Sequence, residues 1–570
     1  MRLVIPLALT LALLASGVPS SPSFAQSTAT PTATSTSTAT TTATATATAT
    51  PGLTVSAVAP TSGSAVSPTP ITVTGTGFVP GSTVMLDGRG QPTTFVDATT
   101  LRVTIPVGLA LGAHTLSVIN PDNATSPLLA GGFSIFGLGS VLYVPIAVRN
   151  AAGDDSGIQV QNNSPSQATV YLAYYDQSGN AVFTSGPQSV AAGDSHTFYQ
   201  PGESGLPGGF DGSAVAHSTQ PVSAIVNRVN YSGALAYSGS LTVPSAAATT
   251  QVNVPLVYGG MNGYNTTLSI QNTSTAAATY TVALQQNGFA SPTASIQVQI
   301  PSLAVRRIRI GSDVAVPTNF VGAAMISSSA SLIAVGETRN TSLNVMLGYA
   351  GIGVGATTMN APLLFKNASN GWVSGVQVVN MANATVTLNA SLRNRDSGIA
   401  FGLPPITLSP NQANFYDLGA LTALPDEWIG SGVFTATGPI GVTVQSINAG
   451  KNTGLGYSAF STGTSSISIP LVFNDYQTWN TGVQVQNLGT ADAFITITYA
   501  LLNGLTISET DTAGPGNSVT FYQPANTALP TNFVGSATVT SNGQPIVAIV
   551  NEVNYARGGD AAMAYEGINH

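Results

Sequence analysis

Short segments in which apolar and polar residues alternate recur along the whole chain, and one of them occurs in four related copies. The segment GVQVQN at 482–487 is matched by GIQVQN at 157–162, GVQVVN at 375–380 and LSIQN at 268–272. Alternation with a period of two is typical of a β-strand with one buried face. In the C-terminal copy it predicts that Val483 and Val485 face a core and that Gln484 and Gln486 point outward. Asn487 is then expected to begin a turn.

The surroundings of this segment repeat with it. The prolines that open each unit are 110, 107 and 108 residues apart: Pro145, Pro255, Pro362 and Pro470. Each unit closes the alternating segment with an asparagine and ends near a tyrosine: Asn162, Asn272, Asn380 and Asn487, then Tyr237, Tyr349, Tyr457 and Tyr565. This period exceeds the roughly 20–50 residues of solenoid repeats and suits a whole immunoglobulin-like domain. We therefore predict four homologous repeats at 141–245, 251–350, 358–461 and 466–570.

Each repeat is predicted to be a β-sandwich. In the first, alternating segments lie near 141–149, 157–163, 168–176, 181–190, 194–200, 212–218, 221–231 and 235–243, and helix signals are nearly absent. A glycine preceded by Asn or Ser recurs after the third strand and predicts a hairpin in every repeat: Gly179, Gly288, Gly398 and Gly504. The short connections at 245–250 and 461–466 favour an end-to-end rod of domains.

The segment before the repeats carries its own pattern. Its features are Pro60–Gly63, Gly75–Phe78, Gly81–Val84, Leu101–Pro106 and Gly112–Pro121. In this combination, residues 53–136 resemble the IPT/TIG family of immunoglobulin-like domains. The resemblance implies a β-sandwich that serves as a spacer or interaction module, without a catalytic role. The predicted fold class is therefore all-β: one IPT/TIG domain followed by four homologous immunoglobulin-like sandwiches.

The N-terminus has the pattern of an export signal. Arg2 precedes the apolar stretch Leu3–Leu14, and Ser23-Phe24-Ala25 is a small-x-small cleavage site. We predict a signal peptide at 1–25 and a secreted or cell-surface protein; the alternative is an uncleaved anchor. Residues 26–52 are rich in Thr, Ala and Pro and are predicted to be a disordered linker. No later segment is long and apolar enough to be predicted as a membrane span.

Composition narrows the function classes. Charged residues are only 6% of the chain, against about 25% in an average soluble protein. The formal net charge of −8 argues against nucleic acid as a partner. The one basic cluster, Arg306, Arg307 and Arg309, is interpreted as an ordinary strand with exposed arginines. Because the chain has no cysteine, disulfides, thiol catalysis and thiolate metal sites are excluded.

No constellation of residues predicts catalysis. The four histidines, His114, His196, His217 and His570, form no zinc-type pair, and His114 has no evident partner. Asp154 and Asp155 could help to hold a calcium ion, but we favour a solvated loop. We therefore predict no catalytic residue, no cofactor and no metal site, and a protein that is not an enzyme.

Aromatic residues offer a candidate contact site. Trp372 and Trp479 each lie three positions before the glycine of the alternating segment, and Tyr264 occupies this position in the second repeat, Asp154 in the first. Such aromatics could stack on a sugar, cap the end of the sandwich or pack against a neighbouring domain. Trp428 aligns with Phe210, Phe320 and Phe533 and is expected in a core.

These features predict a structural or adhesive extracellular protein that acts by protein–protein contact. Strand edges poor in lysine lack the charges that block edge pairing, so we expect self-association or contact with other surface proteins. The alternatives are a carbohydrate-binding protein that uses Tyr264, Trp372 and Trp479 on a polysaccharide, and a non-catalytic part of a secreted enzyme system.

Overall fold

The computed structural model describes residues 52–65, 68–107, 109, 112–137, 140–230, 236–241, 243–244, 249–368, 371–501, 504–554, 556 and 559–570. The predicted signal peptide and nearly all of the predicted linker lie outside these residues. Within them, regular structure is β-strand apart from the short 3-10 helices Gln200–Gly202 (η1), Leu418–Ala420 (η3) and Gln523–Ala525 (η4). The all-β fold class is thus confirmed. A search of the same residues finds no helix with the length and hydropathy needed to cross a membrane.

The first domain is a sandwich of two sheets, as predicted. One sheet has the strand order β1-β3-β7-β6: Thr54–Ala59 (β1), Thr69–Thr76 (β3), Thr100–Ile105 (β7) and Thr93–Asp97 (β6). The other has the order β2-β9-β8-β4-β5: Ser62–Ser64 (β2), Leu129–Phe136 (β9), Gly112–Ile119 (β8), Thr83–Leu86 (β4) and Arg89–Gln91 (β5). The core between them includes Val73, Leu101 and Phe133.

Gly75 shows why this domain carries glycine in its third strand. The register between β1 and β3 shifts opposite it, between Val55 and Ala57, as in a β-bulge. A Cβ atom at position 75 would lie 1.9 Å from the Thr54 carbonyl oxygen. Only glycine therefore fits at this close approach of two backbones.

Each repeat contains a first sheet, which holds the strand that opens the repeat, and a second sheet, which holds the alternating segment. In repeat 1 the first sheet is β13-β12-β15-β10-β18: Ala181–Val190 (β13), Ala168–Tyr175 (β12), Phe210–Ser218 (β15), Ser140–Arg149 (β10) and Val243–Pro244 (β18). Its second sheet is β14-β11-β16-β17: Ser195–Tyr199 (β14), Asp154–Asn162 (β11), Val222–Asn230 (β16) and Ala236–Leu241 (β17).

Repeat 4 has the same two sheets. The first is β37-β36-β39-β34-β42: Thr506–Ala513 (β37), Ala493–Ala500 (β36), Phe533–Ser541 (β39), Ser466–Asn474 (β34) and Ile568–Asn569 (β42). The second is β38-β35-β40-β41: Ser518–Tyr522 (β38), Asn480–Asn487 (β35), Ile546–Val553 (β40) and Ala562–Glu566 (β41).

In repeats 2 and 3 one long strand runs through both sheets. Repeat 2 consists of Thr249–Met261 (β19), Tyr264–Asn272 (β20), Ala278–Gln286 (β21), Ala294–Ile300 (β22), Val305–Arg309 (β23), Phe320–Asn340 (β24) and Val345–Ala350 (β25). Repeat 3 consists of Ala356–Lys366 (β26), Trp372–Asn380 (β27), Val386–Asn394 (β28), Ala400–Gly402 (β29), Ile406–Leu408 (β30), Ala413–Asp417 (β31), Trp428–Asn448 (β32) and Thr453–Ser458 (β33). The first half of β24 pairs with β19 and β21, and its second half with β20 and β25.

The residues that recur along the sequence hold equivalent positions in the fold. In repeats 2 to 4 the terminal tyrosine donates to the carbonyl of the residue after the opening proline, as from Tyr349 Oη to Leu256 O (2.8 Å) and from Tyr457 Oη to Leu363 O (2.6 Å). The closing asparagines are fully buried, and each donates to the last residue of a later strand of its repeat, as from Asn162 Nδ2 to Val190 O of β13 (3.0 Å). Every hairpin glycine has a positive φ, between 68° and 85°.

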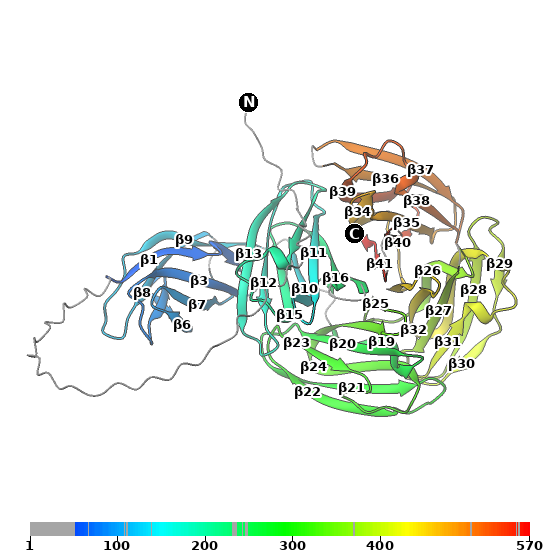
Figure 1. The fold of residues 1–570 in the computed structure, drawn as a ribbon, viewed down its shortest axis with the longest axis horizontal. Helices are drawn as coiled ribbons and strands as arrows, with labels where there is room; N and C mark the ends of the chain where they lie inside the picture. Colours follow the sequence, from blue (N-terminus) through cyan, green and yellow to red (C-terminus); the bar gives the residue numbers. More distant parts are fainter. Residues whose placement is uncertain are drawn as a thin grey trace, which may run out of the picture. The chain divides into compact units, whose positions relative to one another are not determined.

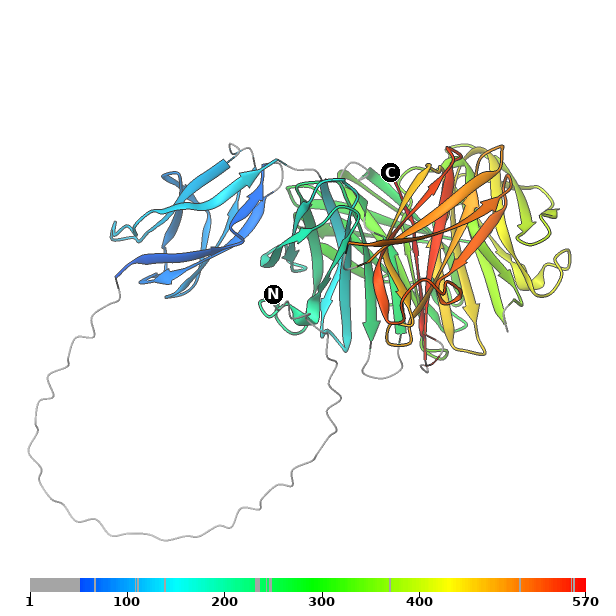
Figure 2. The same ribbon diagram turned by 90° about the horizontal axis from the view of Figure 1, so that it is seen from above.

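The prediction of an end-to-end rod is wrong. The four repeats surround a common centre, where β17, β25, β33 and β41 lie side by side (Figures 1 and 2). Repeat 4 returns to repeat 1: Ser536 Oγ donates to Gly193 O (2.9 Å), and Ser468 Oγ donates to Asn163 Oδ1 (2.7 Å). Short connections restrict how far neighbouring domains separate but not the angle between them, so they are as compatible with a ring as with a rod.

The prediction for the glutamines of the alternating segment is corrected in the same way. Val483 and Val485 are buried as expected, but Gln484 and Gln486 are only 1% and 0% exposed. The first sheet of each repeat packs on the second sheet of the next one, as β26 does on β35 and β34 on β11. The polar face of the alternating strand therefore forms an interface between repeats rather than a solvated surface.

Candidate functional site at the repeat interfaces

Three of the four interfaces between repeats share a polar contact. In each of the three, a serine of the first sheet donates to a loop carbonyl of the next repeat: Ser213 to Leu303 O (2.7 Å), Ser431 to Gly516 O (3.1 Å) and Ser536 to Gly193 O (2.9 Å). Glutamines of the alternating segment donate back: Gln271 Nε2 to Ala214 O (3.3 Å) and Gln161 Nε2 to Ala537 O (3.2 Å).

The interface between repeats 2 and 3 lacks the serine and one glutamine of this pattern. Ala323 stands at the serine position and Val379 at the glutamine position, and both are buried with Ala413 in one small cluster. Polar contact across this interface comes instead from Asn287 of repeat 2 and Gln377 of repeat 3, whose side-chain amides bond to each other, with 3.2 Å from Asn287 Nδ2 to Gln377 Oε1. The serine and the glutamine are therefore replaced together at this interface, which indicates that the two facing repeats carry complementary residues.

A buried ion network joins repeats 1 and 2. Arg228 Nη1 lies 2.9 Å from Glu337 Oε2, and Arg228 Nε lies 2.9 Å from Asp154 Oδ2. Arg339 Nη2 lies 2.5 Å from the same Asp154 oxygen. Burial alone would raise the pKa of Asp154, but Arg228 and Arg339 hold this pKa below its ordinary value. The favoured interpretation of Asp154 as part of a solvated loop is therefore wrong, because it begins strand β11 and faces the neighbouring repeat.

Arg307 also departs from its sequence interpretation. Arg306 and Arg309 are exposed as expected, but the Arg307 side chain is only 11% exposed. It reaches into the interface between repeats 1 and 2, where it donates to Asp211 Oδ1 (2.9 Å) and Pro145 O (3.1 Å). This arginine acts as an interface residue rather than as part of a basic surface.

Three carboxyl groups of repeat 4 are buried near the centre of the ring. Asp560 accepts from the backbone of repeats 2 and 3, at Met346 N (2.7 Å) and Gly454 N (3.0 Å). Glu566 accepts from Ser458 N (2.7 Å), and burial raises the pKa of its carboxyl to about 7. Sequence reasoning missed these residues, although an acidic residue inside the apolar segments IVNEVNY and MAYEG is a usable signal.

Glu552 closes the ring toward repeat 1. Its Oε2 accepts from Asn227 Nδ2 (2.9 Å), while Glu552 Oε1 and Asn227 Oδ1 are buried without a partner among the described residues. Burial raises the pKa of Glu552 to about 8. A protonated carboxyl carries the donor that an amide oxygen needs, so the neutral form suits this pair best.

Two of the four histidines have contacts that the sequence did not indicate. Nδ1 of His114 lies 2.6 Å from Asp87 Oδ2, so the expectation that His114 has no partner is wrong. His217 is fully buried against the Tyr171 ring, and burial lowers its pKa to about 3. No group of three or more His, Cys, Asp or Glu that could hold a metal ion occurs in the described ranges.

The predicted contact aromatics lie at separate places. Tyr264 is half-buried, with its ring 5.3 Å from that of Tyr258. Trp479 is 9% exposed and packs with Met563 and with Val229 of repeat 1. Trp372 is 3% exposed, and its ring lies 5.8 Å from that of Phe365. Contact with a ligand remains a prediction for all three.

Trp372 lines a cavity of about 380 Å³ between repeats 3 and 4. Its apolar lining comes mainly from repeat 3 and its polar lining from both repeats: Leu363, Phe365, Trp372, Ile429, Leu455 and Val553, then Arg395, Lys451, Gln484, Thr520, Tyr522 and Asn551. Sequence reasoning pointed to Trp372 but not to the other lining residues, because they come from two repeats that are distant in sequence.

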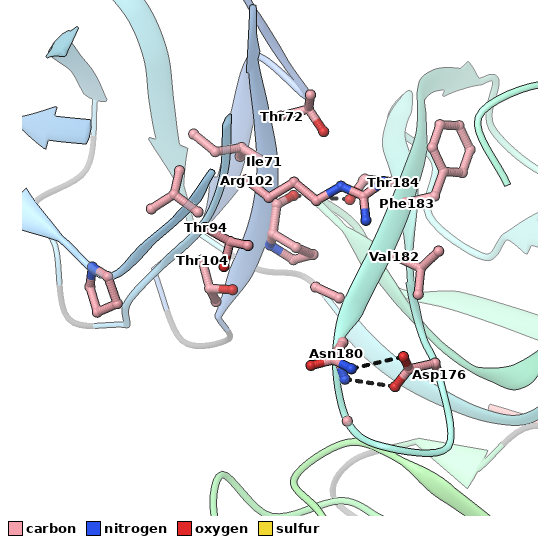
Figure 3. Close-up of a pocket in the computed structure, with 15 residues that line it drawn as sticks. Ile71, Thr72, Thr94, Arg102, Thr104, Asp176, Asn180, Val182, Phe183 and Thr184 are labelled. Carbon is pink, nitrogen blue, oxygen red and sulfur yellow. Dashed lines mark hydrogen bonds between the residues drawn. The ribbon is translucent and has the colours of Figure 1, made fainter. Parts of the chain in front are cut away.

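A second cavity, of about 430 Å³, lies between the first domain and repeat 1. Figure 3 shows Ile71, Thr94 and Arg102 on one side and Val182 and Phe183 on the other, with Arg102 extending toward the opposite strand. Beside it, Thr184 Oγ1 donates to Pro70 O (2.9 Å). Its lining is largely polar and open, and no cluster of titratable groups converges there.

Comparison with known proteins supports one part of this description. Residues 53–131 match the family described as IPT/TIG domain. No curated protein matches the chain.

Three solved structures show weak similarity. Thermotoga maritima 1070 is 17% identical, with a TM-score of 0.17, over 19% of this chain and 94% of that one. The gamma-CGTase from alkalophilic Bacillus clarkii is 20% identical, with a TM-score of 0.13, over 34% of this chain and 25% of that one. A tetra-tandem repeat in the extending region of a large adhesion protein is 12% identical, with a TM-score of 0.09, over 74% of this chain and 97% of that one. TM-scores this low establish no shared architecture.

The described structure and the family match agree on the N-terminal domain. Its two packed sheets form the β-sandwich that the sequence resemblance implied. Residues 53–131 belong to the IPT/TIG family, whose immunoglobulin-like fold is non-catalytic, and a series of further β-sandwich repeats follows them.

Proposed function

We propose that the protein is an extracellular structural protein that presents a rigid ring of four β-sandwiches for contact with other protein surfaces, including further copies of itself. The observation that carries this proposal is the ring closed by matched interfaces. The side-chain contacts between repeat 4 and repeat 1 resemble those between neighbours in sequence. A ring fixed in this way holds its outer loops at constant spacing, which suits a scaffold.

The outer loops carry an apolar residue at one recurring position. Phe289, Ile399 and Leu505 directly follow the hairpin glycines of repeats 2 to 4 and are 58%, 57% and 64% exposed. Asn180 takes this position in repeat 1, where it bonds to Asp176 and lines the cavity beside the first domain. Exposed apolar residues that recur at equivalent positions favour protein contact over chance exposure.

The site of action is part of the proposal. The apolar stretch and cleavage pattern at residues 1–25 support export, and the Thr/Ala/Pro-rich segment at 26–52 suits a spacer between the folded domains and a cell surface. Expression in a bacterial host with the N-terminal segment intact should place the protein outside the cytoplasm. Retention in the cytoplasm would contradict the extracellular assignment.

Light scattering tests the contact surface. The chain that begins at residue 26 should self-associate with rising concentration, and the variant Phe289→Ser/Ile399→Ser/Leu505→Ser should lose this association. The control replaces two exposed apolar residues outside the hairpins, Leu128→Ser and Val354→Ser, which are 66% and 76% exposed in the parent chain. A parent chain that stays monomeric, or association that survives the triple substitution, would overturn the proposed surface.

A further inference from the structure

We infer that the cavity between repeats 3 and 4 binds a small aromatic carboxylate. Its volume of about 380 Å³ lies within the roughly 300–1,000 Å³ range of small-molecule sites. Its floor is built from buried side chains of a folded core, among them Phe365, Trp372 and Leu455 at 8%, 3% and 5% exposure. Such a floor is pre-formed, so a ligand does not have to order it.

The cavity exists because one position of the second sheet is small. Thr520 faces Gln484 on β35. The equivalent residue is Arg307 at the interface between repeats 1 and 2, and Phe415 at the interface between repeats 2 and 3. Arg307 fills its interface with hydrogen bonds, and Phe415 packs against the core of repeat 2. Thr520 leaves this space open.

The interface between repeats 4 and 1 also has a threonine at this position, so the two interfaces can be compared. Thr197 stands there at the position of Thr520. In that interface Trp479 packs with Met563 and with Val229 of repeat 1. The equivalent residues of repeat 3, Trp372 and Leu455, pack in the same way with Val553 of repeat 4, and all three line the cavity. The threonine and this packing are therefore common to both interfaces.

The charge of the lining selects the ligand. Lys451 and Arg395 line the cavity, and no carboxylate does. This is unusual in a chain with only two lysines, Lys366 and Lys451, and a net charge of −8. Arg395 holds the exposed Asp396 through Nε (2.7 Å) and Nη2 (3.2 Å), an exposed pair that is weak in water. A carboxylate at this cationic rim gains charge-assisted hydrogen bonds.

The floor selects the rest of the ligand. Trp372, Leu363 and Leu455 offer carbon surface, and a flat apolar ring gains free energy when it covers them. The hydroxyl groups of a sugar would be buried there without enough partners, at a cost in affinity. The half-exposed Asn551 and Tyr522 supply polar contacts near the opening. The whole lining therefore matches an aryl group with one anionic end.

Calorimetric titration of the full secreted chain with 2-naphthoate tests this inference, with the neutral 2-naphthamide and with glucuronate as the other probes. Naphthoate should bind with one site per chain, and naphthamide roughly tenfold more weakly because it lacks the charge. The variant Thr520→Phe should abolish binding by filling the cavity, as Phe415 fills its interface. The matched control, Thr197→Phe at the equivalent position of repeat 1, should leave binding unchanged.

The rim is tested independently of the floor. Lys451→Gln changes an exposed side chain and should weaken naphthoate binding by roughly tenfold, whereas Arg306→Gln, which removes an exposed charge elsewhere, should not. If Thr520→Phe fails to fold, Lys451→Gln decides the question. Absence of naphthoate binding, binding unaffected by Lys451→Gln, or binding of glucuronate in place of naphthoate would each overturn the inference.

Discussion

The carboxyl group of Glu552 in repeat 4 accepts a hydrogen bond from the side-chain amide of Asn227 in repeat 1, with 2.9 Å between Oε2 and Nδ2. The two residues are 325 positions apart in the chain, and at the point where the ring closes Glu552 is fully buried and Asn227 half-buried. The stability of the closed ring therefore depends on whether the buried carboxyl group of Glu552 is protonated.

The first prediction concerns pH. Burial raises the pKa of Glu552 to about 8 and that of Glu566 to about 7, from an ordinary value of 4.5. Above pH 4.5 the unfolded chain releases these protons while the folded ring keeps them, so the free energy of unfolding falls as pH rises. Below about pH 6.5 the buried His217, whose pKa is lowered to about 3, opposes this trend, because the unfolded chain binds a proton there that the folded ring does not. Thermal unfolding should therefore show a melting temperature that decreases from pH 6.5 to pH 8, with a total loss on the order of a few kcal/mol.

The variant Glu552→Gln isolates one of these groups. It keeps the shape of the neutral side chain and should remove part of the pH dependence, whereas Glu427→Gln, at an exposed position, should leave the dependence unchanged. A melting temperature that rises between pH 6.5 and pH 8 in the parent chain, or a pH dependence there that Glu552→Gln leaves unchanged, would contradict the raised pKa of Glu552.

The second prediction concerns the ion network between repeats 1 and 2. Arg228→Met leaves Asp154 and Glu337 buried, with Glu337 deprived of its cation, and should lower the free energy of unfolding by about 3–5 kcal/mol. Adding Glu337→Gln alone should recover part of this loss, because Asp154 keeps Arg339 as its cation and Glu337 then carries no buried charge. Arg309→Met, which breaks an exposed pair with Asp313, should lower the free energy of unfolding far less in the same denaturation experiment, because water and salt screen this pair.

The third prediction concerns the serine and glutamine pattern. Ser536→Ala removes the donor to Gly193 O at the closing interface and should cost about 1–3 kcal/mol. Gln161→Val alone should also destabilise the protein. The double variant reproduces the apolar pair Ala323 and Val379 of the next-but-one interface, so its cost should be smaller than the sum of the two single costs. Strict additivity in a double-mutant cycle would contradict the matched-interface interpretation.

Sequence patterns predicted the units of this fold well. Period-two alternation, the hairpin glycines and the recurring prolines and tyrosines identify four sandwiches, because each of these residues acts within its own repeat, as Tyr457 does on Leu363. The fate of Gln484 was not predictable in this way. An outward polar side chain looks the same whether it meets water or a neighbouring repeat, and the burial of Gln484 depends on a domain that begins more than one hundred residues earlier.

For the candidate sites too, the sequence predicted features within one repeat but not contacts between repeats. The position of Trp372 was noted from its spacing, but the cavity beside it depends on Thr520 and Lys451, which only the packing of repeats 3 and 4 brings together. The acidic residues Asp154 and Glu552 gave no repeating signal, because each is matched to a different residue in a different neighbour. The alternation of apolar and polar residues predicts which side chains share one face of a strand. Which residues of two different repeats contact each other can be predicted only when the arrangement of the whole ring is known.

The distance between repeats 1 and 4 tests the ring most directly. The chain has no cysteine, so spin labels can be placed at Ala192→Cys and Thr540→Cys, both exposed in the parent protein. Thr540 lies four residues along β39 from Ser536, whose Oγ is 2.9 Å from Gly193 O. Pulsed electron–electron double resonance should therefore give a single distance below about 30 Å between the two spin labels. A distance beyond about 60 Å, as two intervening domains in a rod would impose, would contradict the closed ring.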